Sequence, residues 1–138
     1  TLALMALNIG KGDAVLVPTF TFFASAETVA YANATPVFVD SDPSTFNMCP
    51  IDLEKRIKMV LAGGKLNLKA IMPVDLFGLP ANYPEIQKVA DKYNLKLVED
   101  AAQGFGRARR CRLTQSLWRC GTGLAKALIW LNGSSPTA

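Results

Sequence analysis

The chain has 138 residues, enough for about one domain, and half of them are hydrophobic while 19% are charged. This composition predicts a packed core and excludes an intrinsically disordered chain. The net charge is +4 and there is no histidine, which excludes Ser-His-Asp catalysis, Cys-His catalysis and histidine-based metal sites.

Cysteine usage and hydropathy predict the compartment. The three cysteines, Cys49, Cys111 and Cys120, show no CxxC spacing and predict neither a disulfide framework nor a zinc site, so we expect no bound metal. No apolar run reaches the ~18 residues of a membrane span. Residues 1–7 lack the basic start and the cleavage site of a signal peptide. We therefore expect a cytoplasmic protein without a membrane partner.

Helical and strand patterns alternate along the chain. Apolar periodicity and the positions of Gly and Pro predict, in order, helix 1–9, strand 14–17, helix 24–33, strand 36–40, a helix from Pro50 to the Gly63-Gly64 pair, strand 69–74, helix 83–93 and a strand from Lys96 into Asp100. The strands are apolar throughout, which is typical of a sheet covered on both faces. Right-handed crossovers then favour a mainly parallel sheet and a three-layer α/β/α fold.

Two of the predicted helices carry an apolar face at helical spacing. We expect the inward residues to be Leu53, Ile57, Val60 and Leu61 on the third helix and Ile86, Val89 and Ala90 on the fourth.

The last predicted strand runs into Glu99-Asp100-Ala101-Ala102-Gln103. A carboxylate at the carboxyl end of a parallel strand lies where open α/β sheets bind ligands. The two alanines leave room for a bulky group beside it. The alternative is an acidic strand end that closes a turn.

An aromatic cluster, Phe20, Phe22 and Phe23, follows the first predicted strand. Core packing is the interpretation that we favour for Phe20 and Phe23. One flat ring at a strand end can instead stack on a planar cofactor.

Residues 1–106 resemble the DegT/DnrJ/EryC1/StrS family of pyridoxal-phosphate-dependent sugar aminotransferases. The resemblance rests on motifs in the family's order and spacing: Gly10-Lys11-Gly12-Asp13, Ala34-Thr35-Pro36-Val37-Phe38-Val39-Asp40, Asp42-Pro43-Ser44-Thr45-Phe46-Asn47, Lys69-Ala70-Ile71-Met72-Pro73-Val74-Asp75-Leu76-Phe77-Gly78 and Glu99-Asp100-Ala101-Ala102-Gln103. It implies part of the large domain of a fold-type-I enzyme that binds pyridoxal 5'-phosphate. It also implies transfer of an amino group, from a donor such as glutamate, to a nucleotide-linked keto-sugar, and a homodimer for the intact enzyme.

The resemblance also assigns residues. In the pattern Pro18-Thr19-Phe20-Thr21-Phe22, Phe22 matches the ring that lies against the pyridine of the cofactor. Asp100 matches the carboxylate that keeps the pyridine nitrogen protonated, and Gln103 matches the amide that hydrogen-bonds the phenolic oxygen. Lys126 stands at a suitable distance after Asp100 to be the lysine that binds the cofactor covalently, although its flanking residues differ from the family pattern.

The basic charge lies entirely in the last segment. Residues 1–106 hold nine basic and eleven acidic residues, a net charge of −2, whereas residues 107–138 hold six basic residues and no acid, a net charge of +6. The resemblance stops near Gly106, and our hypothesis is that residues 107–138 are out of frame or otherwise unrelated to the parent enzyme. The chain starts at Thr1 inside a predicted helix. We therefore expect an inactive fragment that lacks the phosphate-binding turn and the smaller C-terminal domain.

Two other readings stay open. The first is a different fold-type-I enzyme, such as a lyase or a dehydratase, which would keep Phe22 and Asp100. The second is a non-catalytic α/β module whose basic tail binds nucleic acid, a partner that we do not expect. A dinucleotide-binding fingerprint is discounted, because Gly10-Lys11-Gly12 follows a helix and lacks the third glycine.

Overall fold

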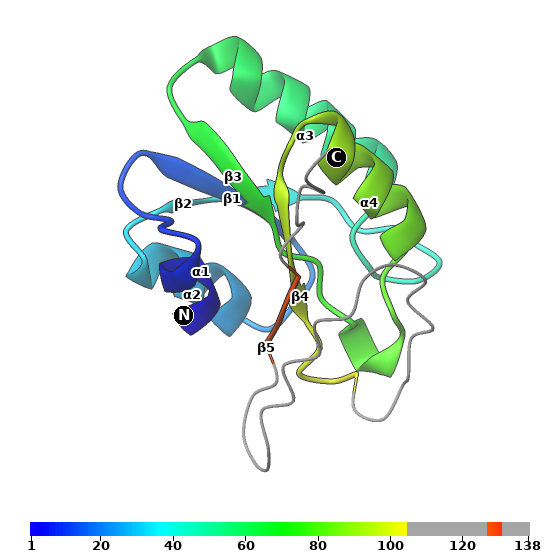
Figure 1. Ribbon diagram of the computed structural model, residues 1–138. Coiled ribbons are helices and arrows are strands. Elements are labelled where there is room, and N and C mark those ends of the chain that lie inside the picture. The colour runs from blue at the N-terminus through cyan, green and yellow to red at the C-terminus, as the bar shows by residue number, and fades with distance from the viewer. Residues whose placement is uncertain (105–126, 131–138) are drawn as a thin grey trace, which may run out of the picture.

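The computed structural model describes residues 1–104 and 127–130 (Figure 1). Helices and strands alternate as the sequence predicts. The elements are α1 (Leu2–Ala6), β1 (Asp13–Pro18), α2 (Ala24–Tyr31), β2 (Thr35–Val39), α3 (Pro50–Gly63), β3 (Asn67–Ile71), the 3₁₀ turn η1 (Leu76–Gly78), α4 (Tyr83–Lys92), β4 (Lys96–Asp100) and β5 (Ala127–Trp130). No helix in this part of the chain has the length and apolarity that a membrane crossing needs.

The strands form one sheet in the order β2-β1-β3-β4-β5. The pairs β1–β2, β1–β3 and β3–β4 are parallel, and β5 runs antiparallel to β4. In Figure 1, α1 and α2 lie on one face of this sheet and α3 and α4 on the other. The three-layer, mainly parallel α/β fold predicted from the sequence is therefore confirmed.

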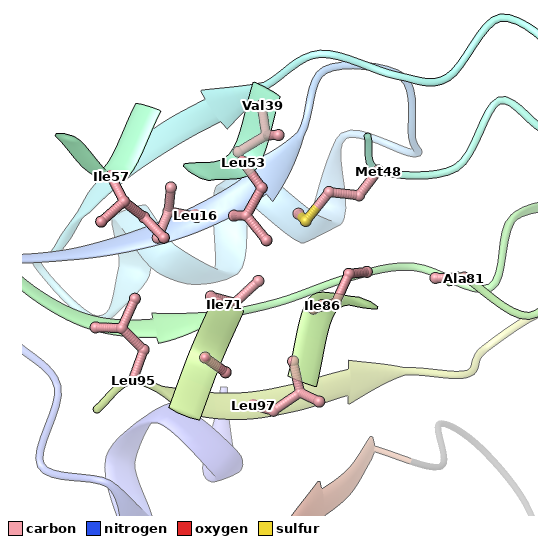
Figure 2. Packing of buried hydrophobic residues seen from close by; sticks show 11 residues of the cluster. Leu16, Val39, Met48, Leu53, Ile57, Ile71, Ala81, Ile86, Leu95 and Leu97 are labelled. Atoms are coloured by element: carbon pink, nitrogen blue, oxygen red, sulfur yellow. The ribbon is translucent and has the colours of Figure 1, made fainter. Parts of the chain in front are cut away.

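Side chains alternate between the two faces because successive strand residues point in opposite directions. On β1, Val15 and Val17 belong to the cluster that packs under α1 and α2, whereas Leu16 belongs to the cluster under α3 and α4. Ala70 and Ile71 on β3 divide in the same way. Figure 2 shows the second cluster, in which side chains of both helices meet the strands. This two-sided burial explains why the strands have no polar face.

The helices α3 and α4 are bounded by the residues that the sequence marks. Pro50 occupies the first turn of α3, and Gly64 ends it with the left-handed φ of 59° that glycine adopts readily. Leu53 and Ile57 are fully buried as predicted. The prediction for Leu61 was wrong: it is 53% exposed, whereas Leu53 and Ile57 on the same helix are fully buried.

The end of β3 differs from the prediction by three residues. The strand was expected to reach Val74, but it ends at Ile71, and Val74 only forms an isolated parallel bridge with Asp100. Pro73 has no N–H group to donate, so the ladder cannot run through it.

The strand order has a topological switch point between β1 and β3. The connection from β1 leads through α2 to β2 on one side, whereas the connection from β3 leads through α4 to β4 on the other. The chain therefore leaves the carboxyl ends of β1 and β3 in opposite directions. In open α/β sheets, ligands bind in the crevice that this reversal creates.

Glu54 on α3 joins the two helices of its layer. Its Oε1 accepts a hydrogen bond from Lys92 Nζ at 2.8 Å and one from Tyr93 OH at 3.1 Å, and it lies 3.0 Å from Lys58 Nζ. The hydrogen bond from Lys92, followed by those from Lys58 and Tyr93, lowers the pKa of Glu54 from 4.5 to about 2.

A pH-dependent loss of stability follows for Glu54→Gln. Because the folded chain lowers this pKa, the contribution of the carboxylate is complete above pH 4.5 and is lost as the pH falls toward about 2. We expect the variant to have a lower Tm than wild type at pH 7 and the two to converge near pH 2. Thermal scans across this range measure the difference. Glu85→Gln, which removes only the exposed pair with Lys88, is the control and should shift Tm less.

Candidate functional site

Asp100 is the last residue of β4, and its carboxylate is held by the helix that follows β1. The hydroxyl of Ser25 on α2 donates to Asp100 Oδ2 at 3.0 Å, although the two residues are 75 positions apart. Ser25 is 4% exposed. Since the single proton of Ser25 goes to the carboxylate, Thr21 donates to Ser25 Oγ across 3.2 Å. A short chain of hydroxyl groups therefore fixes the carboxylate of Asp100.

The backbone around Asp100 is tied to the loop that follows β3. Asp100 N–H donates to Pro73 O, and Asp75 N–H donates to Asp100 O, both at 3.0 Å. Asp100 Oδ1 also accepts a hydrogen bond from Ala102 N–H at 3.3 Å. Asp100 thus closes a turn, as the simpler sequence interpretation had it, and its carboxylate still lies at the carboxyl end of a parallel strand.

Phe22 lies at the entry of α2 with its side chain 73% exposed. Its carbonyl oxygen accepts a hydrogen bond from Ser25 N–H at 3.1 Å. Ser25 therefore contacts Phe22 through its backbone and Asp100 through its side chain. The structure brings these two predicted site residues to the same edge of the sheet and leaves the ring available for stacking.

Gln103 follows β4 and contacts the 3₁₀ turn η1. Its Oε1 accepts a hydrogen bond from Phe77 N–H at 2.7 Å. A backbone N–H can only donate, so the oxygen end of the amide must face Phe77. The NH₂ end is then the group that Gln103 can offer to a ligand. Gly78 lies against the same residue, since a Cβ at Gly78 would stand 3.2 Å from Gln103 O.

Two buried polar residues that the sequence analysis did not single out support this loop. Asp75 Oδ1 accepts from Ala81 N–H at 3.0 Å and from Tyr83 OH at 2.9 Å. Asn47, from the loop after β2, accepts from Leu76 N–H at 3.2 Å and donates to Leu79 O at 3.0 Å. The only signal in the sequence was their place inside motifs at strand ends.

Phe20 and Phe23 are not core residues, which corrects the sequence interpretation. Both are exposed, in the segment between the end of β1 at Pro18 and the start of α2 at Ala24. The ring of Phe20 lies 5.6 Å from that of Phe46 and 6.4 Å from that of Phe77. Phe46 and Phe77 have φ values of 60° and 53°, a conformation that costs side chains with a Cβ about 1–2 kcal/mol.

Lys126 lies outside the described residues, so its predicted role stays a prediction. Within residues 1–104 and 127–130, no three His, Cys, Asp or Glu side chains gather as metal ligands would.

Ser25→Ala tests the hydrogen bond that holds Asp100. We expect the free energy of unfolding to fall by about 1–3 kcal/mol, because the hydroxyl is buried and its partner is a carboxylate. Urea denaturation measures the change. In a double-mutant cycle with Asp100→Ala, which removes the acceptor of this hydrogen bond, the two effects should be less than additive. Strict additivity would mean that the hydrogen bond contributes nothing to stability.

Comparison with known proteins shows that the chain is similar to members of one enzyme family. The sequence pattern of the DegT/DnrJ/EryC1/StrS aminotransferase family matches residues 1–115. The chain is 50% identical over 105 residues to UDP-N-acetyl-3-dehydro-alpha-D-glucosamine 3-aminotransferase of Acidithiobacillus ferrooxidans. That alignment covers 76% of this chain and 27% of the relative. The chain thus spans about a quarter of the length of this relative.

Solved structures share the fold at similar coverage. A DegT/DnrJ/EryC1/StrS aminotransferase from Brucella abortus is 50% identical, with a TM-score of 0.75 over 76% of this chain and 28% of that one. NtdA from Bacillus subtilis, solved with the cofactor PMP bound, is 34% identical, with a TM-score of 0.68 over 76% of this chain and 22% of that one. Sequence and fold agree, and the chain belongs to the DegT/DnrJ/EryC1/StrS aminotransferase family.

Proposed function

We propose that this chain forms part of the pyridoxal-phosphate site of an aminotransferase that moves an amino group onto a nucleotide-linked keto-sugar. The observation that carries the proposal is the carboxylate of Asp100, held by Ser25 at the carboxyl end of β4. The amide of Gln103 follows it, and the exposed ring of Phe22 lies at the entry of the helix that carries Ser25. Family membership supports the same reading.

The side chains at this edge fit pyridoxal phosphate. A carboxylate suits a pyridinium nitrogen, and an aromatic face suits a planar ring. An amide with a fixed donor end suits a phenolic oxygen. Each is supplied by one residue: Asp100, Phe22 and Gln103. The relative from Bacillus subtilis, which was solved with PMP bound, supports the choice of cofactor.

When bound, pyridoxal phosphate supplies an electron sink for negative charge that develops on the substrate carbon. In the proposal, Asp100 holds a proton on the pyridine nitrogen, because an adjacent negative charge favours the cationic form. Ser25 keeps that carboxylate in place through its buried hydroxyl. Phe22 covers one face of the ring, and Gln103 donates a hydrogen bond to the phenolic oxygen. Lys126 is proposed to bind the cofactor covalently.

The proposed substrate class follows the relatives. The enzyme of Acidithiobacillus ferrooxidans is named for a UDP-linked 3-dehydro sugar, and a 45% identical protein of Pseudomonas aeruginosa for a UDP-linked 3-oxo sugar acid. We propose a nucleotide-linked keto-sugar for this chain as well, with glutamate as a typical amino donor. Cell-surface polysaccharide or antibiotic sugar biosynthesis is the proposed setting. The intact enzyme is proposed to be a cytoplasmic homodimer.

Absorbance spectroscopy tests the cofactor site directly. The purified chain is mixed with pyridoxal phosphate, and spectra are recorded before and after borohydride reduction, followed by peptide mapping. We expect a protein-dependent absorbance band and a reduced adduct on Lys126. An adduct spread over several exposed lysines, with no band above that of free cofactor, would contradict a specific site in this chain.

A further inference from the structure

The turn that meets Gln103 is held by a residue of another loop. The turn η1 lies between β3 and α4, whereas Asn47 lies in the segment between β2 and α3. Asn47 is 3% exposed, and both ends of its amide are used: Oδ1 accepts from Leu76 N–H, and Nδ2 donates to Leu79 O. One side chain therefore spans η1 from its first residue to the residue after its end.

Asn47 is itself firmly placed. Its carbonyl oxygen accepts a hydrogen bond from Asp42 N–H at 2.8 Å, and the next residue, Met48, is 1% exposed within the core. The isolated bridge between Ser41 and Met48 closes the same segment. Because Asn47 sits on this fixed base, its amide holds the backbone of η1 instead of moving with it.

Asn47 and Gln103 accept hydrogen bonds from neighbouring residues of η1. Leu76 N–H is bound to Asn47, and the next backbone donor, Phe77 N–H, is bound to Gln103 Oε1 at 2.7 Å. Phe77 has a φ of 53°, which a phenylalanine adopts only when the surrounding structure imposes it. That conformation directs Phe77 N–H to Gln103.

We propose that Asn47 is a positioning residue for Gln103. By fixing η1, it keeps the oxygen end of the Gln103 amide on Phe77 N–H and so presents the NH₂ end to the ligand. This inference rests on the proposed function for the role of that NH₂ group, but the orientation itself exists without a cofactor. Without the side chain of Asn47, Phe77 N–H is no longer held toward Gln103. The amide of Gln103 can then turn either its oxygen or its NH₂ group toward a ligand.

Nuclear magnetic resonance of the ¹⁵N-labelled chain without cofactor tests the orientation. The Asn47→Ala variant should exchange the Phe77 amide hydrogen roughly tenfold faster than wild type. The side-chain NH₂ resonances of Gln103 should move toward those of a solvated glutamine. Exchange at the buried strand residues Val15 and Ile71 reports whether the variant stays folded and should remain within about twofold.

Asn82→Ala is the matched control. Asn82 precedes α4 in the same connection, is exposed and makes no side-chain cap hydrogen bond. It should leave the Phe77 exchange rate and the Gln103 resonances unchanged. A purely structural role for Asn47 would alter exchange around η1 without moving the Gln103 side-chain resonances, and that result would overturn the proposal.

Variants of Gln103 test the hydrogen bond on which the proposal rests, even if Asn47→Ala fails to fold. Gln103→Glu keeps an acceptor oxygen and should leave Phe77 N–H protected, whereas Gln103→Ala should raise its exchange roughly tenfold. Unchanged protection in Gln103→Ala would overturn the proposal. Because none of these measurements uses pyridoxal phosphate, failure of the chain to bind the cofactor would count against the proposed function alone.

Discussion

Asp100→Asn is expected to weaken the binding of pyridoxal phosphate by about 10- to 100-fold. The carboxylate carries the negative charge that would face the pyridinium nitrogen, and a hydrogen bond to a charged group contributes about 1.5–3 kcal/mol. Asparagine keeps the size of the side chain and its contact with Ser25 but removes the charge. Fluorescence or absorbance titration of the chain with the cofactor measures the change.

Glu99→Gln is the control for Asp100→Asn. Glu99 precedes Asp100 on β4, so its side chain points to the opposite face of the sheet. The variant removes the same negative charge as Asp100→Asn, but on the other face of the sheet, so we expect it to keep its cofactor affinity within about twofold of wild type. Equal losses in both variants would indicate a general electrostatic effect and would argue against a specific role for Asp100.

Leu53→Ala is expected to lower the free energy of unfolding by about 3 kcal/mol. Leu53 is fully buried between α3 and the sheet, where it belongs to the cluster shown in Figure 2. Truncation removes the transfer free energy of the side chain and leaves a cavity that its neighbours fill only in part. Urea denaturation of the chain, with the slope m checked for constancy, measures the loss.

Leu61→Ala provides the matched comparison on the same helix. It makes the same chemical change two turns further along α3, but its side chain is 53% exposed. We expect a loss below about 1 kcal/mol. Similar losses for the two variants would mean that the end of α3 is covered in solution by another part of the protein.

The layers of the fold could be predicted from the sequence because the composition of each strand depends on whether its faces are buried. On β1, the run from Ala14 to Val17 has no polar residue, and only a strand buried on both faces tolerates that. The ends of α3 could also be predicted, because Pro50 and Gly64 mark them. Boundaries shifted where pairing depends on a neighbour, as at Pro73, whose missing N–H ends β3 early.

Burial could not be predicted where it depends on distant segments. Leu61 fits the apolar face of α3 by spacing, yet it is exposed whereas Leu53 and Ile57 are buried. Phe20 and Phe23 are as apolar as any core residue, but they lie in the connection between β1 and α2 and are exposed. Periodicity records which residues share a face, whereas the extent of the opposing surface is a property of the whole fold.

The site residues were predicted from family resemblance, but the residues that support them through hydrogen bonds were not predicted. Ser25 and Asn47 are small polar residues whose roles come from contacts with segments far away in sequence. A serine in the first turn of a helix is ordinary at the level of local pattern. Only the folded sheet brings the hydroxyl of Ser25 to Asp100 and the amide of Asn47 to the loop after β3.

The bond between Ser25 and Asp100 has a consequence for the order of assembly. Ser25 is synthesised 75 residues before its partner, and the two meet only after β3 has paired with β1 and β4 with β3. Contacts of such long sequence separation form late, because the intervening chain must first be ordered. A ligand at this edge therefore recognises the completed sheet and not its precursors. At 100 times its Kd, such a ligand would stabilise the folded chain by about 2.7 kcal/mol and so protect it from degradation.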